Sequence, residues 1–142
     1  MASILKVDTL TGVTTAGSIS VTGEGNSTTT NLQQGLAKVW VHFDGHTGND
    51  IRDSLNITSA TDHSTGRYEY FFTNNMSSAY YCYSHNCGGA TGSSGDDSYG
   101  NTGGAGVSGG LNTDSMYSRS RHYNGSIYDI DVDCMMAHGD LT

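Results

Sequence analysis

The sequence predicts an all-β protein, and three observations lead to this prediction. Short segments alternate apolar and polar residues. This period of two is typical of strands that have one apolar face and one polar face. Helical periodicity does not extend over three turns in any segment. Charged residues make up only 14% of the chain, whereas 20 glycines and many Ser, Thr and Asn residues suit turns and strand surfaces. We therefore expect an antiparallel β-sandwich or jelly-roll-like head with an extended N-terminal arm.

The expected arm covers residues 1–35 and contains two short strand-like segments, 4–10 and 18–22. Two isolated short strands are marginal in water, so an ordered arm has to pair with another chain or with the body. The alternative is a flexible tail. We expect the arm to serve oligomerisation and attachment through its apolar side chains, which are Ile4, Leu5, Val7, Leu10, Ile19 and Val21.

The expected head covers residues 36–142 and is built from strands. Alternating or apolar runs predict them at 39–43, 51–57, 67–73, 79–85, 116–123 and 127–137. A turn is expected at 62–66, where polar residues and a glycine separate two runs. Residues 88–110 are expected to form a Gly-rich loop, and loops of this length inside a compact domain are usually functional or disordered.

Asn124–Gly125 predicts a hairpin between the last two strands, because this pair between alternating runs is a strong hairpin signal. A loop of three residues, 124–126, would place Arg119 and Arg121 opposite carboxylates. A two-residue loop would place the same arginines opposite an isoleucine and a tyrosine. Opposite charges across strands are favourable, so we expect the three-residue loop.

Three carboxylates, Asp129, Asp131 and Asp133, are expected on one face of the last strand. Such a row can bind a hard cation, or it can supply the acid and the base for cleavage of a glycosidic bond. The preferred interpretation is that the three aspartates neutralise Arg119 and Arg121 and face water.

Other motifs for metal binding or catalysis are weak. Residues 44–50 combine oxygen ligands with glycines, but they lack the acidic spacing of an EF-hand, so an ordinary hairpin loop is expected. No nucleophile elbow, phosphate loop or dinucleotide fingerprint is present, and an enzyme is therefore not expected.

Three cysteines and two histidines raise the question of a zinc site. Cys82, His85 and Cys87 are close in sequence, but Cys134 and His138 would join them only by chance, so no metal and no cofactor are expected. We expect free, buried thiols, since the odd number of cysteines is typical of synthesis under reducing conditions. A Cys82–Cys87 disulfide that forms after release is the alternative.

Several tyrosines flank the Gly-rich loop or lie in it. A tyrosine offers an apolar face and a hydroxyl at low entropic cost, which suits recognition of sugars or protein surfaces. The alternative is that the strand tyrosines belong to the core with satisfied hydroxyls, and the sequence leaves both open. The candidate recognition surface consists of Tyr81, Tyr83, Tyr99 and Tyr117.

The formal charge of −8 limits the classes of partner. No basic run exists that would bind nucleic acid or an anionic membrane surface. Apolar runs of the length that spans a bilayer are missing, so membrane insertion is not expected. The first residues, MASILK, lack the features of a secretory signal, and we expect synthesis in the cytoplasm.

Two stretches resemble virion structural proteins of cyanophages and related marine tailed phages, including tail-fibre-like and decoration proteins. One is AKVWVHFDG at 37–45, and the other is IRDSLNITSATD at 51–62 with TGRY at 65–68. The opening LKVDTL at 5–10 is similar to N-terminal segments of such proteins. Residues 83–142 depart from the pattern. The resemblance implies a non-enzymatic particle component, commonly a homotrimer, located in the virion.

We therefore expect a homotrimeric tail-fibre or short-spike protein that is anchored by its arm to other virion proteins. Its head would contact the host surface, either a glycan or a protein. The first alternative is a capsid decoration, or cement, protein, which the short length of 142 residues favours over a fibre with its own shaft. The second alternative is a carbohydrate depolymerase that uses Asp129 or Asp133.

Overall fold

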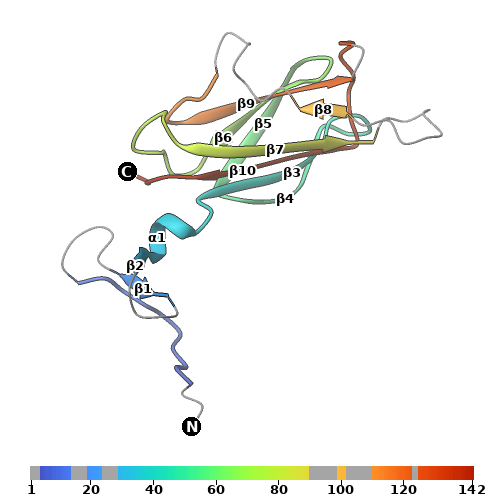
Figure 1. Cartoon of the computed structure of the whole chain (residues 1–142). Helices are drawn as coiled ribbons and strands as arrows, with labels where there is room; N and C mark the ends of the chain where they lie inside the picture. The colour runs from blue at the N-terminus through green and yellow to red at the C-terminus, as the bar shows by residue number, and fades with distance from the viewer. Residues whose placement is uncertain (1–3, 14–18, 24–28, 90–98, 102–109, 123–124) are drawn as a thin grey trace. The chain divides into compact units, whose positions relative to one another are not determined.

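The computed structural model describes residues 4–13, 19–23, 29–89, 99–101, 110–122 and 125–142. The chain divides into two compact units, Met1–Leu36 and Ala37–Thr142 (Figure 1). Strands dominate the second unit, and the one helix in the described ranges is a single short turn in the first unit. The prediction of an all-β protein is confirmed.

The N-terminal unit contains a two-stranded antiparallel sheet of β1 (Ser20–Thr22) and β2 (Thr29–Asn31). Helix α1 (Leu32–Gly35) follows β2 directly. Asn31 is its N-cap, and the Asn31 side chain accepts hydrogen bonds from the backbone N–H groups of the first turn. Residues 4–13 contain no strand, contrary to the expectation for 4–10, because no other described residue pairs with their backbone.

The second unit is a sandwich of two four-stranded antiparallel sheets in the described residues. We call β4-β3-β10-β7 the first sheet and β5-β6-β9-β8 the second sheet, each in spatial order. The strands of the first sheet are β3 (Val39–Asp44), β4 (Asp50–Leu55), β7 (Cys82–Gly88) and β10 (Val132–His138). The strands of the second sheet are β5 (Ile57–Ser64), β6 (Arg67–Phe72), β8 (Tyr99–Asn101) and β9 (Ser115–His122).

The core lies between the two sheets and is rich in aromatic rings. The ring of Phe43 on β3 lies 5.0 Å from that of Tyr68 and 5.4 Å from that of Tyr70, both on β6. These inward residues are the alternating positions that the sequence identified at 39–43 and 67–73, which confirms both strands. The other fully buried large apolar side chains are Val39, Val41, Met76, Met116, Ile130 and Met135.

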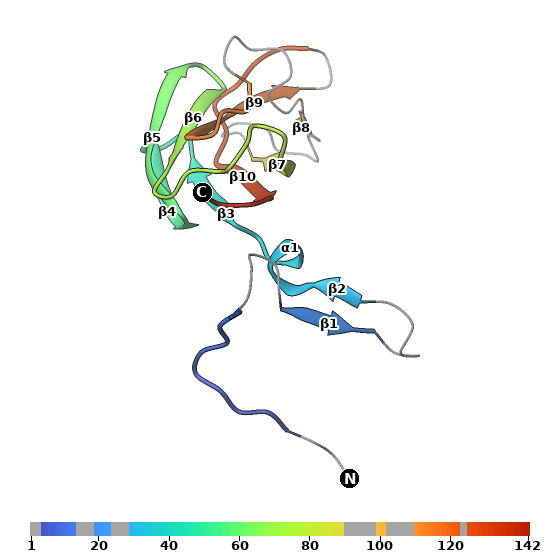
Figure 2. The same cartoon turned by 90° about the vertical axis from the view of Figure 1, so that its left-hand side faces the viewer.

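The strand predicted at 51–57 is divided in two at Asn56. This residue has a positive φ of 61°, which Asn tolerates better than most residues and which ends β4. Its side chain accepts a hydrogen bond from the backbone N–H of Asn74 at 2.7 Å and thereby fixes the corner. The chain passes here from the first sheet to the second, and β4 and β5 lie side by side at one edge of the sandwich (Figure 2).

The prediction of a hairpin around Asn124–Gly125 is wrong. Strand β9 lies between β6 and β8 in the second sheet, whereas β10 lies between β3 and β7 in the first sheet. Among the described residues, the strand pairing between these two segments is limited to an isolated bridge of Arg121 with Ile127, which fits neither of the two expected loop lengths. The longer pairings of β9 with β6, and of β10 with β3 and β7, outweigh the local turn signal.

The Gly-rich loop predicted at 88–110 is interrupted by β8, which pairs with the end of β9. Gly110, at the end of this stretch, accepts a hydrogen bond from the backbone N–H of Tyr117 at 3.3 Å. Residues 90–98 and 102–109 lie outside the described residues.

Candidate functional site

The residues predicted for attachment belong to the N-terminal unit, and none of the six is buried within its described part. Exposed fractions are 76% for Ile4, 78% for Leu5, 55% for Val7, 55% for Leu10 and 49% for Val21, and Ile19 is half-buried. A contiguous group of exposed apolar side chains is typical of an interaction site. Residues 4–10 therefore offer apolar surface that a second chain can bury.

A fully buried carboxylate, Asp133 on β10, lies between the two sheets. The hydroxyl of Tyr70 donates to its Oδ2 at 2.8 Å, and the hydroxyl of Ser118 donates to the same oxygen. Nε2 of His85 contacts Oδ1. Burial, and then the charge of Asp133, raises the pKa of Tyr70 well above its usual value, so the hydroxyl stays protonated and donates. These partners replace water and make a buried carboxylate tolerable.

The serine, aspartate and histidine of this cluster are not arranged as a hydrolytic triad. In a triad the imidazole lies between the hydroxyl and the carboxylate, so that it can take the hydroxyl proton. Here Asp133 lies between Ser118 and His85, which contact different carboxylate oxygens. Both Asp133 and the His85 side chain are 0% exposed, so a polysaccharide cannot reach them. The cluster is structural, and Asp133 was wrongly considered for glycosidic cleavage.

The two preceding aspartates do not pair with the arginines of β9. Oδ1 of Asp129 accepts hydrogen bonds from the backbone N–H of Gly66 at 2.7 Å and from the hydroxyl of Tyr68 at 3.0 Å. Oδ1 of Asp131 lies 3.4 Å from Nδ1 of His46. Both aspartates precede β10, so the expectation that three carboxylates share one strand face and neutralise the arginines is wrong.

The loop at 44–50 connects β3 and β4 as the expected hairpin loop. Its first carboxylate, Asp44, is almost completely buried and accepts hydrogen bonds from the backbone N–H groups of His46 at 3.0 Å and Thr47 at 2.9 Å. Its other oxygen contacts the guanidinium of Arg52. The bond from Thr47 and then the bond from Arg52 lower the pKa of Asp44 to about 2. The carboxylate of Asp44 thus stabilises the turn between β3 and β4.

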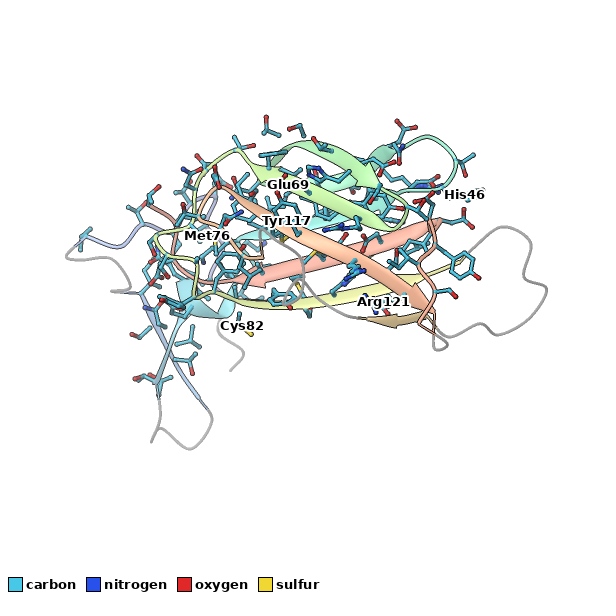
Figure 3. All side chains as sticks on the ribbon, turned by 90° about the horizontal axis from the view of Figure 1, so that it is seen from above. His46, Glu69, Met76, Cys82, Tyr117 and Arg121 are labelled. Atoms are coloured by element: carbon cyan, nitrogen blue, oxygen red, sulfur yellow. The ribbon has the colours of Figure 1, made fainter. Side chains whose placement is uncertain are left out.

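A polar and aromatic cluster lies on the outer face of the second sheet around Glu69 (Figure 3). Its carboxylate lies 2.8 Å from Nε2 of His63 and accepts a hydrogen bond from the hydroxyl of Ser115 at 2.8 Å. The His63 ring stacks on Tyr117 with centroids 5.5 Å apart. Burial raises the pKa of Glu69, but hydrogen bonds from Tyr117, His63 and Ser115 outweigh it and lower this pKa.

The four tyrosines of the candidate recognition surface do not share one environment. Tyr81 is only 7% exposed and donates to a backbone oxygen of β9 at 3.2 Å, so its assignment to a surface is wrong. Tyr83 is half-buried against the core, and the side chain of Tyr99 lies outside the described residues. Tyr117 faces outward in the cluster around Glu69. Tyr80, which was not in the set, is 97% exposed.

The three cysteines are free thiols in unlike positions. Cys82 is exposed, Cys87 is buried and Cys134 is half-buried, so the expectation of buried thiols fails for Cys82. Five residues along an extended strand separate Cys82 from Cys87 by roughly 16 Å, too far for a disulfide within β7. In the described parts of the chain, no three His, Cys, Asp or Glu side chains are grouped to hold a metal ion.

Sequence reasoning missed the position of Asp133, although a signal was present. Asp133, Met135 and Ala137 alternate along β10 and point to the same side, as the period of a strand requires. An aspartate in register with two core residues is therefore expected inside.

Comparisons with protein families, with curated proteins and with solved structures find no significant match for this chain. In the residues that the structure describes, no helix is both long and apolar enough to cross a membrane.

Proposed function

We propose that this chain is a structural surface protein of a tailed-bacteriophage virion, a homotrimer of tail-fibre or short-spike type. The observation that carries the proposal is the exposed apolar segment 4–10. The resemblance of residues 5–10, 37–45, 51–62 and 65–68 to phage virion proteins supports it. The N-terminal unit anchors the protein to other virion proteins, and the sandwich faces the host surface.

The proposal assigns no catalytic role to the sandwich. Its serine, histidine and aspartate cluster is buried and has the wrong order for nucleophilic attack. Asp129, the other carboxylate considered for glycoside cleavage, accepts hydrogen bonds from Gly66 and Tyr68 within the fold.

A second candidate is a capsid decoration protein, and the same segment favours it. An extended segment with exposed apolar side chains can lie across the joint between neighbouring capsid subunits and bury its surface there. The two candidates differ in where the protein sits on the particle.

Labelling intact particles with an antibody raised against the full chain separates these candidates. Label on the tail is expected, and label confined to capsid faces would replace the fibre assignment by the decoration assignment. If the lysate contains the protein but the particles purified from it carry no label, both the fibre assignment and the decoration assignment are contradicted.

The oligomeric state is tested by light scattering of the full chain. We expect a trimer, and a triple variant with Ile4→Ser, Leu5→Ser and Val7→Ser should dissociate because it loses the apolar surface of segment 4–10. Val13→Ser is the matched control, because Val13 is 94% exposed in the same unit but outside the predicted attachment set. A monomeric full chain would contradict trimerisation.

A further inference from the structure

Three arginines lie together on the outer face of the second sheet. Arg67 on β6 is the direct cross-strand partner of Arg119 on β9, and Arg121 follows two residues later on the same side of β9. Their neighbours on β9, Ser118 and Ser120, are fully buried and point inward, so the arginines point outward. The whole chain has only six lysines and arginines and a net charge of −8, so half of its positive side chains gather here.

These arginines lack acidic partners within the described part of the chain. The ion pairs found there join other residues, and Arg67, Arg119 and Arg121 take part in none of them. The Nε atoms of Arg119 and Arg121 are buried without a hydrogen-bond partner among the described residues. Burial, followed by the charges of Arg121 and Arg67, lowers the pKa of Arg119.

The arrangement is unfavourable unless a negative group joins it. Like charges directly opposite each other on neighbouring strands repel, and a buried N–H without an acceptor costs free energy. Glu69 is on the same face, but His63, Ser115 and Tyr117 already occupy its carboxylate. An oxyanion from outside the chain would relieve the repulsion between the like charges, because guanidinium groups bind carboxylate and sulfate oxygens through paired hydrogen bonds.

We propose that Arg67, Arg119 and Arg121 form a binding site for the carboxylate or sulfate groups of an acidic polysaccharide. A polysaccharide fits because aromatic surface adjoins the arginines. Tyr117 precedes Arg119 by two residues on the same face and stacks on His63, and flat aromatic faces pack against sugar rings.

This site rests on residues of the sandwich unit and does not depend on the virion assignment. The probes are dextran sulfate, polygalacturonate, polyglutamate and neutral dextran, titrated against the full chain by calorimetry at fixed ionic strength. The variants are Arg119→Gln and, as a control matched in charge, Lys38→Gln, which lies next to β3 of the first sheet. Arg121→Gln serves as a second variant with an intact Arg67 and Arg119 pair.

We expect the full chain to bind at least one acidic polymer and not dextran. Arg119→Gln should weaken this binding by at least about tenfold, and Lys38→Gln should change it by less than about twofold. Inorganic sulfate should raise the melting temperature of the wild type more than chloride of equal ionic strength does, and this difference should shrink in Arg119→Gln. Without ligand, Arg119→Gln should melt no lower than the wild type, since it removes a like-charge contact.

Three results would overturn the proposal. One is equal weakening by Lys38→Gln and by both arginine variants, which would indicate a general charge effect. Another is equal affinity for dextran and for the acidic polymers. The third is tighter binding of polyglutamate than of either acidic polysaccharide, which would point to an acidic protein as the partner.

Discussion

Replacing Asp44 by Asn should remove an acid-sensitive part of the stability of the sandwich. The folded protein holds the pKa of this carboxyl at about 2 instead of 3.8, first through the backbone N–H of Thr47 and then through Arg52. At about 1.4 kcal/mol per pH unit, this difference corresponds to roughly 2 kcal/mol of unfolding free energy at neutral pH. The Asp44 side chain is only 6% exposed but that of Arg52 is 52% exposed, so solvent screens the contact with Arg52 more than the bond from Thr47.

The sign of the pH dependence follows from the lowered pKa. Between the two pKa values the unfolded chain binds more protons than the folded chain, so the contribution is complete above about pH 4 and is lost as the pH falls toward about 2. Urea unfolding of wild type and Asp44→Asn from pH 2 to pH 7 should therefore show a difference of roughly 2 kcal/mol that vanishes at the acid end.

Asp53→Asn provides the matched control, because Asp53 is an exposed carboxylate on the neighbouring strand β4. Its stability should follow that of the wild type across the pH range, within about 0.5 kcal/mol. The reasoning is refuted if Asp44→Asn keeps full stability at pH 7, or if its difference from the wild type stays constant down to pH 2.

Three further changes probe other parts of the sandwich. Asp133→Ala leaves three buried side chains without their carboxylate partner and should cost about 3 kcal/mol or more in denaturant unfolding; a loss below 1 kcal/mol would contradict the structural role. Gly66→Ala should lower the melting temperature, because Gly66 has a φ of 60° and an added Cβ would lie 2.6 Å from the backbone oxygen of Tyr128; an unchanged melting temperature would show that this turn relaxes freely. A thiol reagent at pH 8 should modify Cys82 rapidly and Cys87 only after unfolding, since burial raises the pKa of Cys87 to about 11; mass spectrometry of the native protein and of Cys82→Ser checks the order.

The sequence predicted the strands whose inward positions are all apolar. At 39–43 burial alternates residue by residue, and at 67–73 Tyr68, Tyr70 and Phe72 are buried as predicted, although Glu69 is buried as well. The corner at Asn56 escaped prediction because the alternation hardly changes across it, and only the backbone conformation shows that the strand ends. Local patterns determine which residues face inward but say little about which sheet a strand joins.

The candidate sites were harder to predict because their members come together through pairing distant in sequence. Arg67 and Arg119 are 52 positions apart, and only the register of β6 with β9 makes them neighbours. The same holds for the contact of Asp133 with Tyr70, 63 positions away. The expected hairpin led to a wrong assignment of the aspartates, because it placed Asp129 and Asp131 opposite the arginines of β9. In the structure β9 and β10 belong to different sheets.

The buried carboxylate also has a mechanical consequence. Apolar side chains allow one sheet to slide over another with little directional penalty, whereas hydrogen bonds have preferred distances and angles. Asp133 of the first sheet is bonded to Tyr70 and Ser118 of the second, so a lateral shift of about 1 Å between the layers would break both bonds at once. Together with the bond from the Tyr81 hydroxyl to the backbone oxygen of Ser115, this residue opposes shear between the two sheets.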